Sequence, residues 1–422
     1  MSISTYTTDK ASPFARAVVS SMRKLYPEAL ADKSFDNTGL LLEAPFDPIR
    51  RQMNSVLLTV DLTKAVADEA IERKDCVVVA YHPIIFRGLK SLTLADTQQQ
   101  SLLRLALEGI SVYCPHTAID AAPGGLGDWL ADIVTGTLPK PEPATRTARF
   151  SESGSASIDT TSSNRVPATS DDDPFVEKTT GAVGEEQSPR TSTAKQRPSR
   201  FVPQRTYSRP TYPEHVDAEH TDLKPQSVGH KRAVLHPVTG VEGFESAGMG
   251  RLVTFVTPQP LTYLIERIAR GVGNPKGFPV AIPQNRQVED IDIKTVAICA
   301  GSGGSVFRNV KVDLLFTGEL SHHEALAATE QGMSVVTLFH SNSERGFLHS
   351  VLREQLASTL KEEWKKVREA EKQEEGLSEE WEEALADEDV LVEVSERDRD
   401  PFGMVILESS RQVGKSLDGG HN

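Results

Sequence analysis

The sequence predicts an α/β protein with two α/β domains, each built around a mostly parallel sheet. Short apolar runs rich in Val and Ile alternate with helical patterns in two separate blocks of the chain. The runs are almost continuously apolar, as expected of strands that helices cover on both faces. A long polar segment separates the blocks, and 422 residues are enough for two domains.

The first block, residues 1–138, predicts a regular alternation of strands and helices. It opens with an amphipathic stretch, Phe14 to Leu30, in which Phe14, Val18, Met22 and Leu25 recur at helical spacing. We expect strands at 55–61, 76–81 and 110–115, and helices at 63–73, 98–108 and 125–134.

The second block, residues 233–412, repeats this alternation of strands and helices. We expect strands at 252–256, 295–299, 312–316 and 334–339, and helices at 261–270, 321–331 and 344–360. A late strand at 390–393 is expected to close this block. Residues 361–389 are almost all charged or Trp and Leu, with Glu and Lys at helical spacing, which predicts a solvated helical insertion on the surface.

Two further segments lack the apolar content that a packed core requires. Residues 139–232 are rich in Ser, Thr and Pro and contain an acidic run at 171–173. Burial of so little apolar surface cannot offset the entropy of ordering the chain, so we expect a disordered insertion. The last residues, 413–422, are expected to form a disordered tail.

The charge and cysteine content narrow the class of protein. The chain has 60 acidic and 46 basic residues, a net charge of -14, which disfavours nucleic-acid binding despite a basic stretch at 195–205. Three Cys residues are too few for a disulfide framework and favour a reducing compartment. We expect a cytoplasmic protein, with the nucleus as an alternative and no membrane span. The amphipathic start predicts a surface helix better than a mitochondrial presequence.

Five polar residues follow predicted strands and point to a metal site. His82 follows the strand at 76–81, His116 and Asp120 follow that at 110–115, and His340 and Glu344 follow that at 334–339. Ligands of open α/β sheets bind at the carboxyl ends of the strands, so these side chains are expected to converge. Imidazole and carboxylate without thiolate suit zinc, manganese, iron or nickel, with one or two ions per protomer.

Other interpretations of the strand ends stay open. Each His taken alone is more often a hydrogen-bonded loop residue than a ligand. Asp61 is most simply part of a helix N-cap region, and Glu319 is a better candidate for a hydrogen-bond partner of a ligand. The glycine-rich turn at 299–305 is consistent either with backbone N–H groups that bind phosphate or with a tight turn that needs positive φ.

Several segments together resemble one known family, the Nif-three-like or Ngg-one-interacting-factor proteins. They are FDNTGLLLE (35–43), YHPIIFRGLK (81–90), HTAIDAAPGGLGDWLA (116–131), GMGRL (248–252), CAGSGG (299–304), DLLFTGELSHHEAL (313–326), HSNSERGFL (340–348) and SERDRDPF (395–402). The resemblance covers both blocks and omits the Ser/Thr/Pro-rich and acidic segments.

The resemblance implies two α/β domains, a homo-oligomer that forms a hexameric ring, and a two-metal site. Carried over position by position, it assigns the metal to His82, His116, Asp120, His340 and Glu344. Many bacterial members have a second His where this chain has Tyr81. Because a phenol is a poor neutral ligand, this difference predicts weaker or single-ion occupancy.

Two functions follow as expectations from the resemblance and the strand-end residues. Members are labelled as similar to GTP cyclohydrolase type one, which favours a metal-dependent hydrolase that acts on a small nucleotide-like or cyclic substrate. The alternative is a non-catalytic interaction protein or transcriptional co-regulator in which metal has a structural role. Its protein partners would bind the segment at 139–232.

Overall fold

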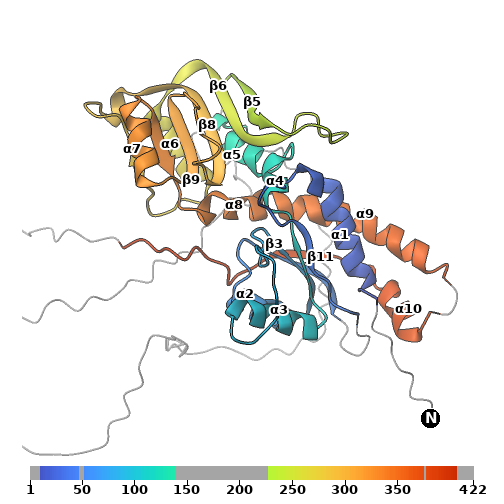
Figure 1. Cartoon of the computed structure of the whole chain (residues 1–422). Coiled ribbons are helices and arrows are strands. Elements are labelled where there is room, and N and C mark those ends of the chain that lie inside the picture. The colour runs from blue at the N-terminus through green and yellow to red at the C-terminus, as the bar shows by residue number, and fades with distance from the viewer. Residues whose placement is uncertain (1–9, 47–51, 138–226, 375–376, 406–422) are drawn as a thin grey trace, which may run out of the picture. The chain divides into compact units, whose positions relative to one another are not determined.

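The computed structural model describes residues 10–46, 52–137, 227–374 and 377–405, which form two sheets with helices packed on them (Figure 1). The predicted tail at 413–422 and most of the predicted insertion at 139–232 lie outside the described residues. The α/β fold class is confirmed.

The first sheet has five strands in the order β1-β4-β3-β2-β11. All neighbours are parallel except β1 and β4. The bounds are β1 Gly39–Leu42, β2 Met53–Thr59, β3 Asp75–Ala80, β4 Ser111–Cys114 and β11 Leu391–Val394. Strand β1 was not predicted, because four residues next to a loop give too short an apolar pattern.

The late strand joins the first sheet and not the second, so our expectation that it closes the second block is wrong. Strand β11 runs parallel to β2, with Leu391 opposite Ser55 and Val392 opposite Val56. Sequence order alone suggested the nearer sheet. The pairing brings the C-terminal part of the chain back onto the first block.

Consecutive residues of the central strand β3 enter different cores, which explains its continuous apolar run. Val77 and Val79 belong to the largest hydrophobic cluster, whereas Val78 and Ala80 pack in a second cluster with helices α2 Lys64–Arg73 and α3 Thr97–Leu107. Alternation of side chains is the ordinary consequence of strand geometry. Both faces of the sheet are therefore buried (Figure 1).

The second sheet has six strands in the order β5-β6-β8-β9-β10-β7 and is mixed. Strands β8, β9 and β10 are parallel neighbours, whereas β5, β6 and β7 pair antiparallel. The bounds are β5 His230–Pro237, β6 Gly248–Pro260, β7 Val280–Ala281, β8 Asp292–Ser302, β9 Leu314–Glu319 and β10 Ser334–Thr337. Strands β5 and β7 were not predicted, because exposed positions interrupt the apolar pattern of β5 and β7 has two residues.

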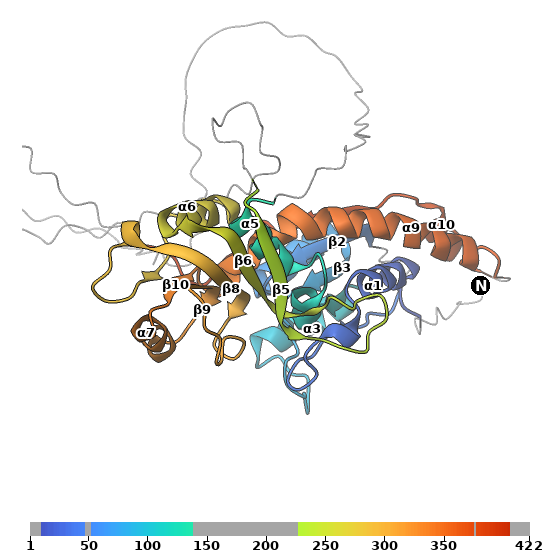
Figure 2. The same ribbon diagram turned by 90° about the horizontal axis from the view of Figure 1, so that it is seen from above.

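The remaining helices are α1 Pro13–Leu25, α4 His116–Ala121, α5 Leu126–Thr135, α6 Leu261–Gly271, α7 His322–Glu330, α8 Arg345–Phe347, α9 Arg353–Glu371 and α10 Glu379–Ala386. A single π-turn, Leu348–Leu352, joins α8 to α9. Helix α9 runs beside α1 (Figure 2).

The expectation of a solvated insertion at 361–389 is wrong for helix α9. Trp364 is 1% exposed, and its ring meets that of Phe14 on α1 edge-to-face at 5.4 Å. Lys361, Glu362 and Lys365 face solvent, so one apolar stripe lies within a mostly charged sequence. The overall composition of the segment did not reveal this apolar stripe, because charged residues surround it in the sequence.

A buried arginine on β6 ties the second sheet to helices α4 and α5. Arg251 is 1% exposed, and its guanidinium donates to both carboxylate oxygens of Asp128 at 2.9 and 3.1 Å. It also donates to the carbonyl oxygens of Gly248, Gly250 and Ala122. We call Arg251 and Asp128 the buried arginine cluster.

Two further features of the fold concern membrane-spanning helices and a pocket that contains a cysteine. No helix within the described part of the chain combines the length and apolar character that crossing a bilayer requires.

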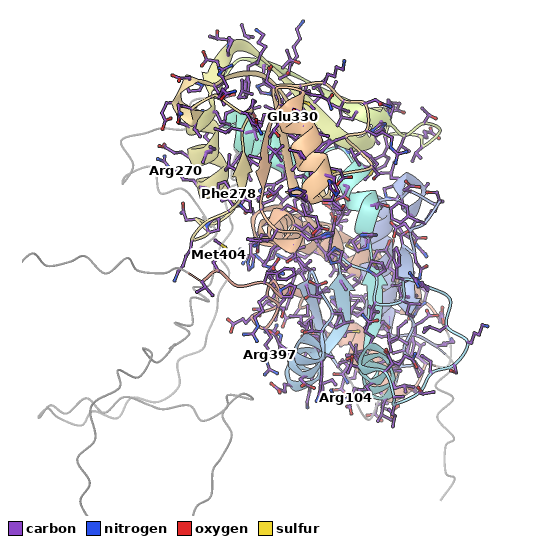
Figure 3. All side chains as sticks on the ribbon, turned by 60° about the vertical axis from the view of Figure 1, so that its left-hand side comes forward. Arg104, Arg270, Phe278, Glu330, Arg397 and Met404 are labelled. Carbon is purple, nitrogen blue, oxygen red and sulfur yellow. The ribbon has the colours of Figure 1, made fainter. Side chains whose placement is uncertain are left out.

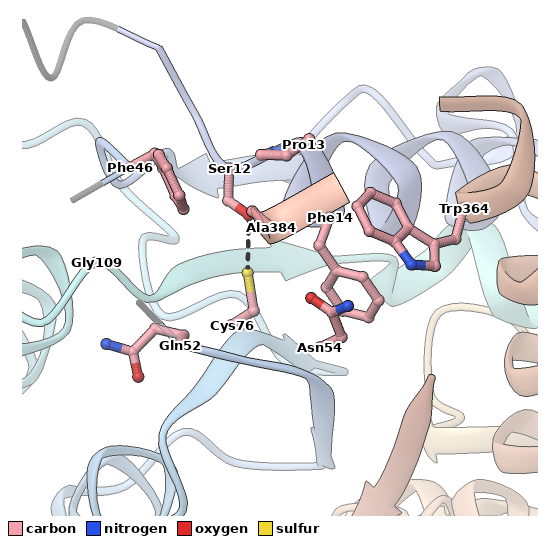
Figure 4. A pocket seen from close by; sticks show the side chains of 10 residues that line it. All are labelled: Ser12, Pro13, Phe14, Phe46, Gln52, Asn54, Cys76, Gly109, Trp364 and Ala384. Carbon is pink, nitrogen blue, oxygen red and sulfur yellow. Dashed lines mark hydrogen bonds between the residues drawn. The ribbon is translucent and has the colours of Figure 1, made fainter. Parts of the chain in front are cut away.

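A small pocket beneath α1 is lined by Cys76, Ser12 and Trp364, among other residues (Figure 4). The thiol of Cys76 donates a hydrogen bond to Ser12 Oγ at 3.4 Å. Burial raises the pKa of the Cys76 thiol to about 11, which makes it a poor nucleophile.

Candidate metal centre

The five predicted residues follow the carboxyl ends of β3, β4 and β10. His82 lies two residues beyond β3, His116 and Asp120 lie on α4 after β4, and His340 and Glu344 flank a short turn after β10. The His82 N–H donates to Val60 O at 3.0 Å, which extends the pairing of β2 and β3 and fixes the backbone of His82.

Three of the five side chains meet at one point, which we call the His–His–Glu cluster: His82, His340 and Glu344. One ligand atom of each lies within 4.8 Å of the others. Nε2 of His82 is 3.4 Å from Glu344 Oε2, and Nε2 of His340 is 3.5 Å from Glu344 Oε1. The cluster joins residues that are more than 250 positions apart in the sequence.

The other two predicted residues, His116 and Asp120, lie beside this cluster but not within it. The imidazole rings of His82 and His116 are 5.7 Å apart between centroids. Asp120 instead accepts a hydrogen bond at 2.8 Å from the hydroxyl of Tyr81. Tyr81, which stands where many bacterial members have a second His, therefore forms a hydrogen bond with one oxygen of Asp120, a predicted ligand.

Each of the three histidines has its Nδ1 held by a carboxylate. His82 pairs with Asp61 at 2.9 Å, His116 with Asp36 at 2.6 Å and His340 with Glu319 at 2.9 Å. Partners of this kind fix the tautomer and ring orientation of metal-binding histidines and leave Nε2 for the ion. The tautomer itself is inferred from these partners.

The three carboxylate partners can be compared with the roles that the sequence predicted for these loop residues. Glu319 is the partner expected from the sequence. Asp61 is not a helix cap, because Thr63 caps α2 by accepting from Val66 N. Asp36 was missed: it lies in a loop without periodicity, and the only signal was its place within FDNTGLLLE.

The burial and hydrogen bonding of Glu344, and the space at Gly301, fit a cation at the His–His–Glu cluster. Glu344 is 1% exposed, yet its Oε2 accepts no hydrogen bond from the described residues. Buried carboxylate oxygens normally accept hydrogen bonds, and Oε2 has instead a 3.4 Å contact with Nε2 of His82, which is consistent with a cation between the two groups. A Cβ on Gly301 would lie 2.7 Å from Glu344 Oε1 and 2.9 Å from His340 Nε2. Gly301 thus leaves free the space that a side chain would fill.

The glycine-rich turn at 299–305 is a tight turn, and two of its N–H groups are already bonded within the protein. Gly301 has φ of +56°, the region that favours glycine. Its N–H donates to Ser343 Oγ at 2.8 Å, and the N–H of Gly303 donates to Glu319 O. These two donors are used within the protein and are not available to an anion.

The electrostatics indicate a strongly coupled site. Burial lowers the pKa of His82, but Glu344 and Asp61 outweigh burial and raise it to about 10. Burial raises the pKa of Asp120 to about 6, against the opposing effects of His116 and Tyr81. Burial and the neighbouring Asp120 raise the pKa of Tyr81 well above its ordinary value. Perturbed groups of this kind gather at functional sites.

Two backbone conformations near the site are strained. His116 has φ of +31°, and Phe339, directly before His340, has φ of +65°. Positive φ is uncommon for residues with bulky side chains. Such strain is typical of sites where surrounding contacts hold a side chain in a required position.

These observations define a two-sheet α/β protein with a histidine and carboxylate cluster that could bind a metal ion. A model of the family described as Duf34/NIF3 (NGG1p interacting factor 3) matches residues 14–374. The chain therefore belongs to the Duf34/NIF3 family, which confirms the resemblance seen in its sequence.

Two relatives support this assignment, and a solved structure shares the fold. The chain is 37% identical to Protein NIF3 homolog of Schizosaccharomyces pombe over 343 residues, which cover 81% of this chain and 88% of the relative. It is 32% identical to NGG1-interacting factor 3 of Saccharomyces cerevisiae, over 80% of this chain and 88% of the relative. The crystal structure of a Bacillus cereus protein related to NIF3 shares the fold, with a TM-score of 0.52, 17% identity and coverage of 92% and 98%.

Proposed function

We propose that this chain is a metal-dependent hydrolase that acts on a small nucleotide-like or cyclic substrate. The observation that supports it most directly is the buried Oε2 of Glu344, which lacks a hydrogen bond and faces Nε2 of His82 at 3.4 Å. Leaving a buried carboxylate unsatisfied costs free energy that a bound cation would recover.

The His–His–Glu cluster would hold a first divalent ion, zinc, manganese, iron or nickel, through Nε2 of His82 and His340 and the carboxylate of Glu344. Such an ion supplies Lewis acidity for hydrolysis. Asp61 and Glu319 hold the two imidazoles in the orientation that this role requires. Gly301 keeps backbone, and no side chain, against the cluster.

His116 and Asp120 are proposed to form a second, weaker position. Asp36 holds Nδ1 of His116, so its Nε2 is the atom left for an ion. Asp120, however, is engaged by the Tyr81 hydroxyl at 2.8 Å. We therefore propose one tightly held ion per protomer, with Tyr81 and Asp120 positioned to transfer protons.

The test is the metal content per protomer of the full chain, purified without chelator or affinity metal. We expect one ion in the wild type and none in His340→Ala. His322→Ala is the matched control, because His322 is exposed on α7 and lies outside the cluster. Loaded protein is then screened for hydrolysis of cyclic and nucleotide-like compounds. A wild type without metal would overturn the proposal.

The second candidate function is a non-catalytic interaction protein. The Saccharomyces cerevisiae relative is named NGG1-interacting factor 3. By analogy, this chain would bind protein partners through residues 139–232, in the cytoplasm or nucleus, while metal stabilises the two blocks or a homo-oligomeric ring. Removal of residues 139–226 should then abolish partner capture and leave metal content unchanged. An unaltered set of partners would contradict this candidate.

A further inference from the structure

The C-terminal segment 395–402, which we call the strap, follows β11 and contacts both blocks. Its first residues bind helix α2, because the backbone N–H groups of Glu396 and Arg397 donate to Glu69 at 2.9 and 3.2 Å. Its last residue, Phe402, lies with its ring 6.3 Å from that of Phe339. The strap corresponds to the motif SERDRDPF, to which the proposed function gives no role.

Between these ends, the strap contacts the immediate neighbours of the metal-centre residues. Asp398 Oδ2 accepts from the N–H of Val60 at 2.7 Å, next to the Asp61 that holds His82. Asp400 accepts from Ser341 Oγ at 2.6 Å, next to His340. Asp398 also pairs with Arg345, next to Glu344.

These contacts form one continuous set of hydrogen bonds and ion pairs. Arg345 donates to Ser341 Oγ at 2.8 Å, so Asp398, Arg345, Ser341 and Asp400 are linked in order. Ser341 is the first residue of the turn between His340 and Glu344, and Arg345 directly follows Glu344. The link therefore fixes both ends of the turn that provides two of the three cluster residues.

The pair of Arg345 and Asp398 is buried, unlike the pair that Arg397 of the strap forms with Glu72. The side chains of Arg345 and Asp398 are 6% and 3% exposed. Those of Arg397 and its partner Glu72 are 40% and 60% exposed, and Arg397 projects outward from the first block (Figure 3). A buried ion pair contributes little net stability compared with apolar residues of similar size, so stability alone does not account for this pair.

We propose that the strap is a positioning element for the metal centre, in which Asp398 and Asp400 fix the turn that presents His340 and Glu344 to a divalent cation. Asp398 and Asp400 do not touch the cation; they act through Arg345 and Ser341. The inference depends on the proposed metal centre. Loss of an outer partner of this kind commonly weakens metal affinity 10- to 100-fold.

The test measures Zn²⁺ affinity of the metal-stripped full chain by competition with a chromophoric chelator. We expect the dissociation constant to rise about tenfold or more in Asp398→Asn. Arg397→Gln is the matched control on the same strap and should bind Zn²⁺ as the wild type does. In the metal-free state, amide exchange of residues 339–345 should be faster in Asp398→Asn and unchanged in Arg397→Gln.

A double variant separates positioning from folding. Arg345→Met with Asp398→Leu removes both buried charges, so it should melt at or above the temperature of Asp398→Asn. We expect it to retain weakened Zn²⁺ binding. A folded double variant with wild-type affinity would overturn the inference while leaving the metal centre intact. A wild type that binds no Zn²⁺, with the same result for His340→Ala, would instead overturn both proposals.

Discussion

The His–His–Glu cluster and the buried arginine cluster are both polar groups in the interior, but their hydrogen bonding differs. Arg251 donates to Asp128 and to three carbonyl oxygens, and Asp128 also accepts from Gly124 N and Arg232. Glu344, equally buried, leaves Oε2 without a hydrogen bond among the described residues. The buried arginine cluster is complete in the protein alone, whereas the His–His–Glu cluster requires a further partner.

This difference separates a structural role from a binding role. A fully satisfied buried network stabilises one arrangement of the elements that it joins. An unsatisfied one destabilises the protein until a ligand supplies the missing interaction. Substitutions should therefore affect metal binding at one cluster and stability at the other.

The largest effect is expected for Glu344→Gln. The amide keeps the shape of the side chain but removes the negative charge that balances a divalent ion, so metal should be lost completely on dialysis. Elemental analysis of the purified variant measures this loss.

The free energy of unfolding of the metal-free Glu344→Gln variant is the control for this prediction. It reports the loss of the contacts between Glu344 and Nε2 of His82 and His340, at 3.4 and 3.5 Å, separately from the loss of metal. A variant that retains metal would show that the carboxylate is not a ligand.

A second large effect is expected for Tyr81→His. The substitution removes the hydroxyl that engages Asp120 and adds an imidazole next to His116, so the metal content should rise from one ion to two. Tyr81→Phe is the control: it frees Asp120 without adding a ligand and should gain less. If both variants and the wild type bind the same number of ions, Tyr81 is not the reason for single-ion occupancy.

The sequence predicted the main strands and helices of this fold well where apolar runs were long. Strands β2, β3, β8 and β9 are buried on both faces and gave continuous runs of Val, Leu and Ile. Strands β5 and β7 lie at the sheet edges, where exposed positions interrupt the pattern. The partner of β11 could not be predicted, because strand pairing is a long-range choice that local periodicity does not encode.

The candidate site was predictable in its residue types but not in its grouping. The strand-end rule indicated His82 and His340, and the structure places them together. That rule cannot say that Tyr81 binds Asp120, or that Asp36 reaches His116 across 80 residues. Such pairs depend on the packing of separate loops, which a single sequence does not reveal.

A smaller effect, on stability alone, is expected for Asp128→Asn. The variant loses charge-assisted bonds to Arg251, so its free energy of unfolding should fall by about 2 kcal/mol. Urea unfolding measures the difference, and metal content should remain that of the wild type. Asp132→Asn, one turn further on α5, should cost less, since burial raises the pKa of Asp132 and its charge is less favourable.

The cost of Asp128→Asn should depend on pH. Burial acts to raise the pKa of Asp128, but Arg251 and the N–H of Gly124 outweigh burial and hold it below its ordinary value. The carboxylate therefore contributes its full stabilisation above the unfolded pKa of about 4 and loses it as the pH falls through the lower folded pKa. The gap between wild type and variant should be constant from pH 7 to pH 5 and close below about pH 4. A gap that widens in acid would contradict this assignment.

The smallest effect is expected for Glu319→Gln, which tests whether the partners of the histidines support the metal. Glu319 holds Nδ1 of His340 at 2.9 Å but is 51% exposed, so solvent screens much of its charge. The Zn²⁺ dissociation constant should rise by about tenfold or less, the lower end of the range for such partners. Asp61→Asn should have the larger effect, because Asp61 is 35% exposed and also lies in the field of Arg345. A larger effect of Glu319→Gln than of Asp61→Asn would contradict this prediction. It would mean that Glu319 is itself a metal ligand and that the site extends along β9.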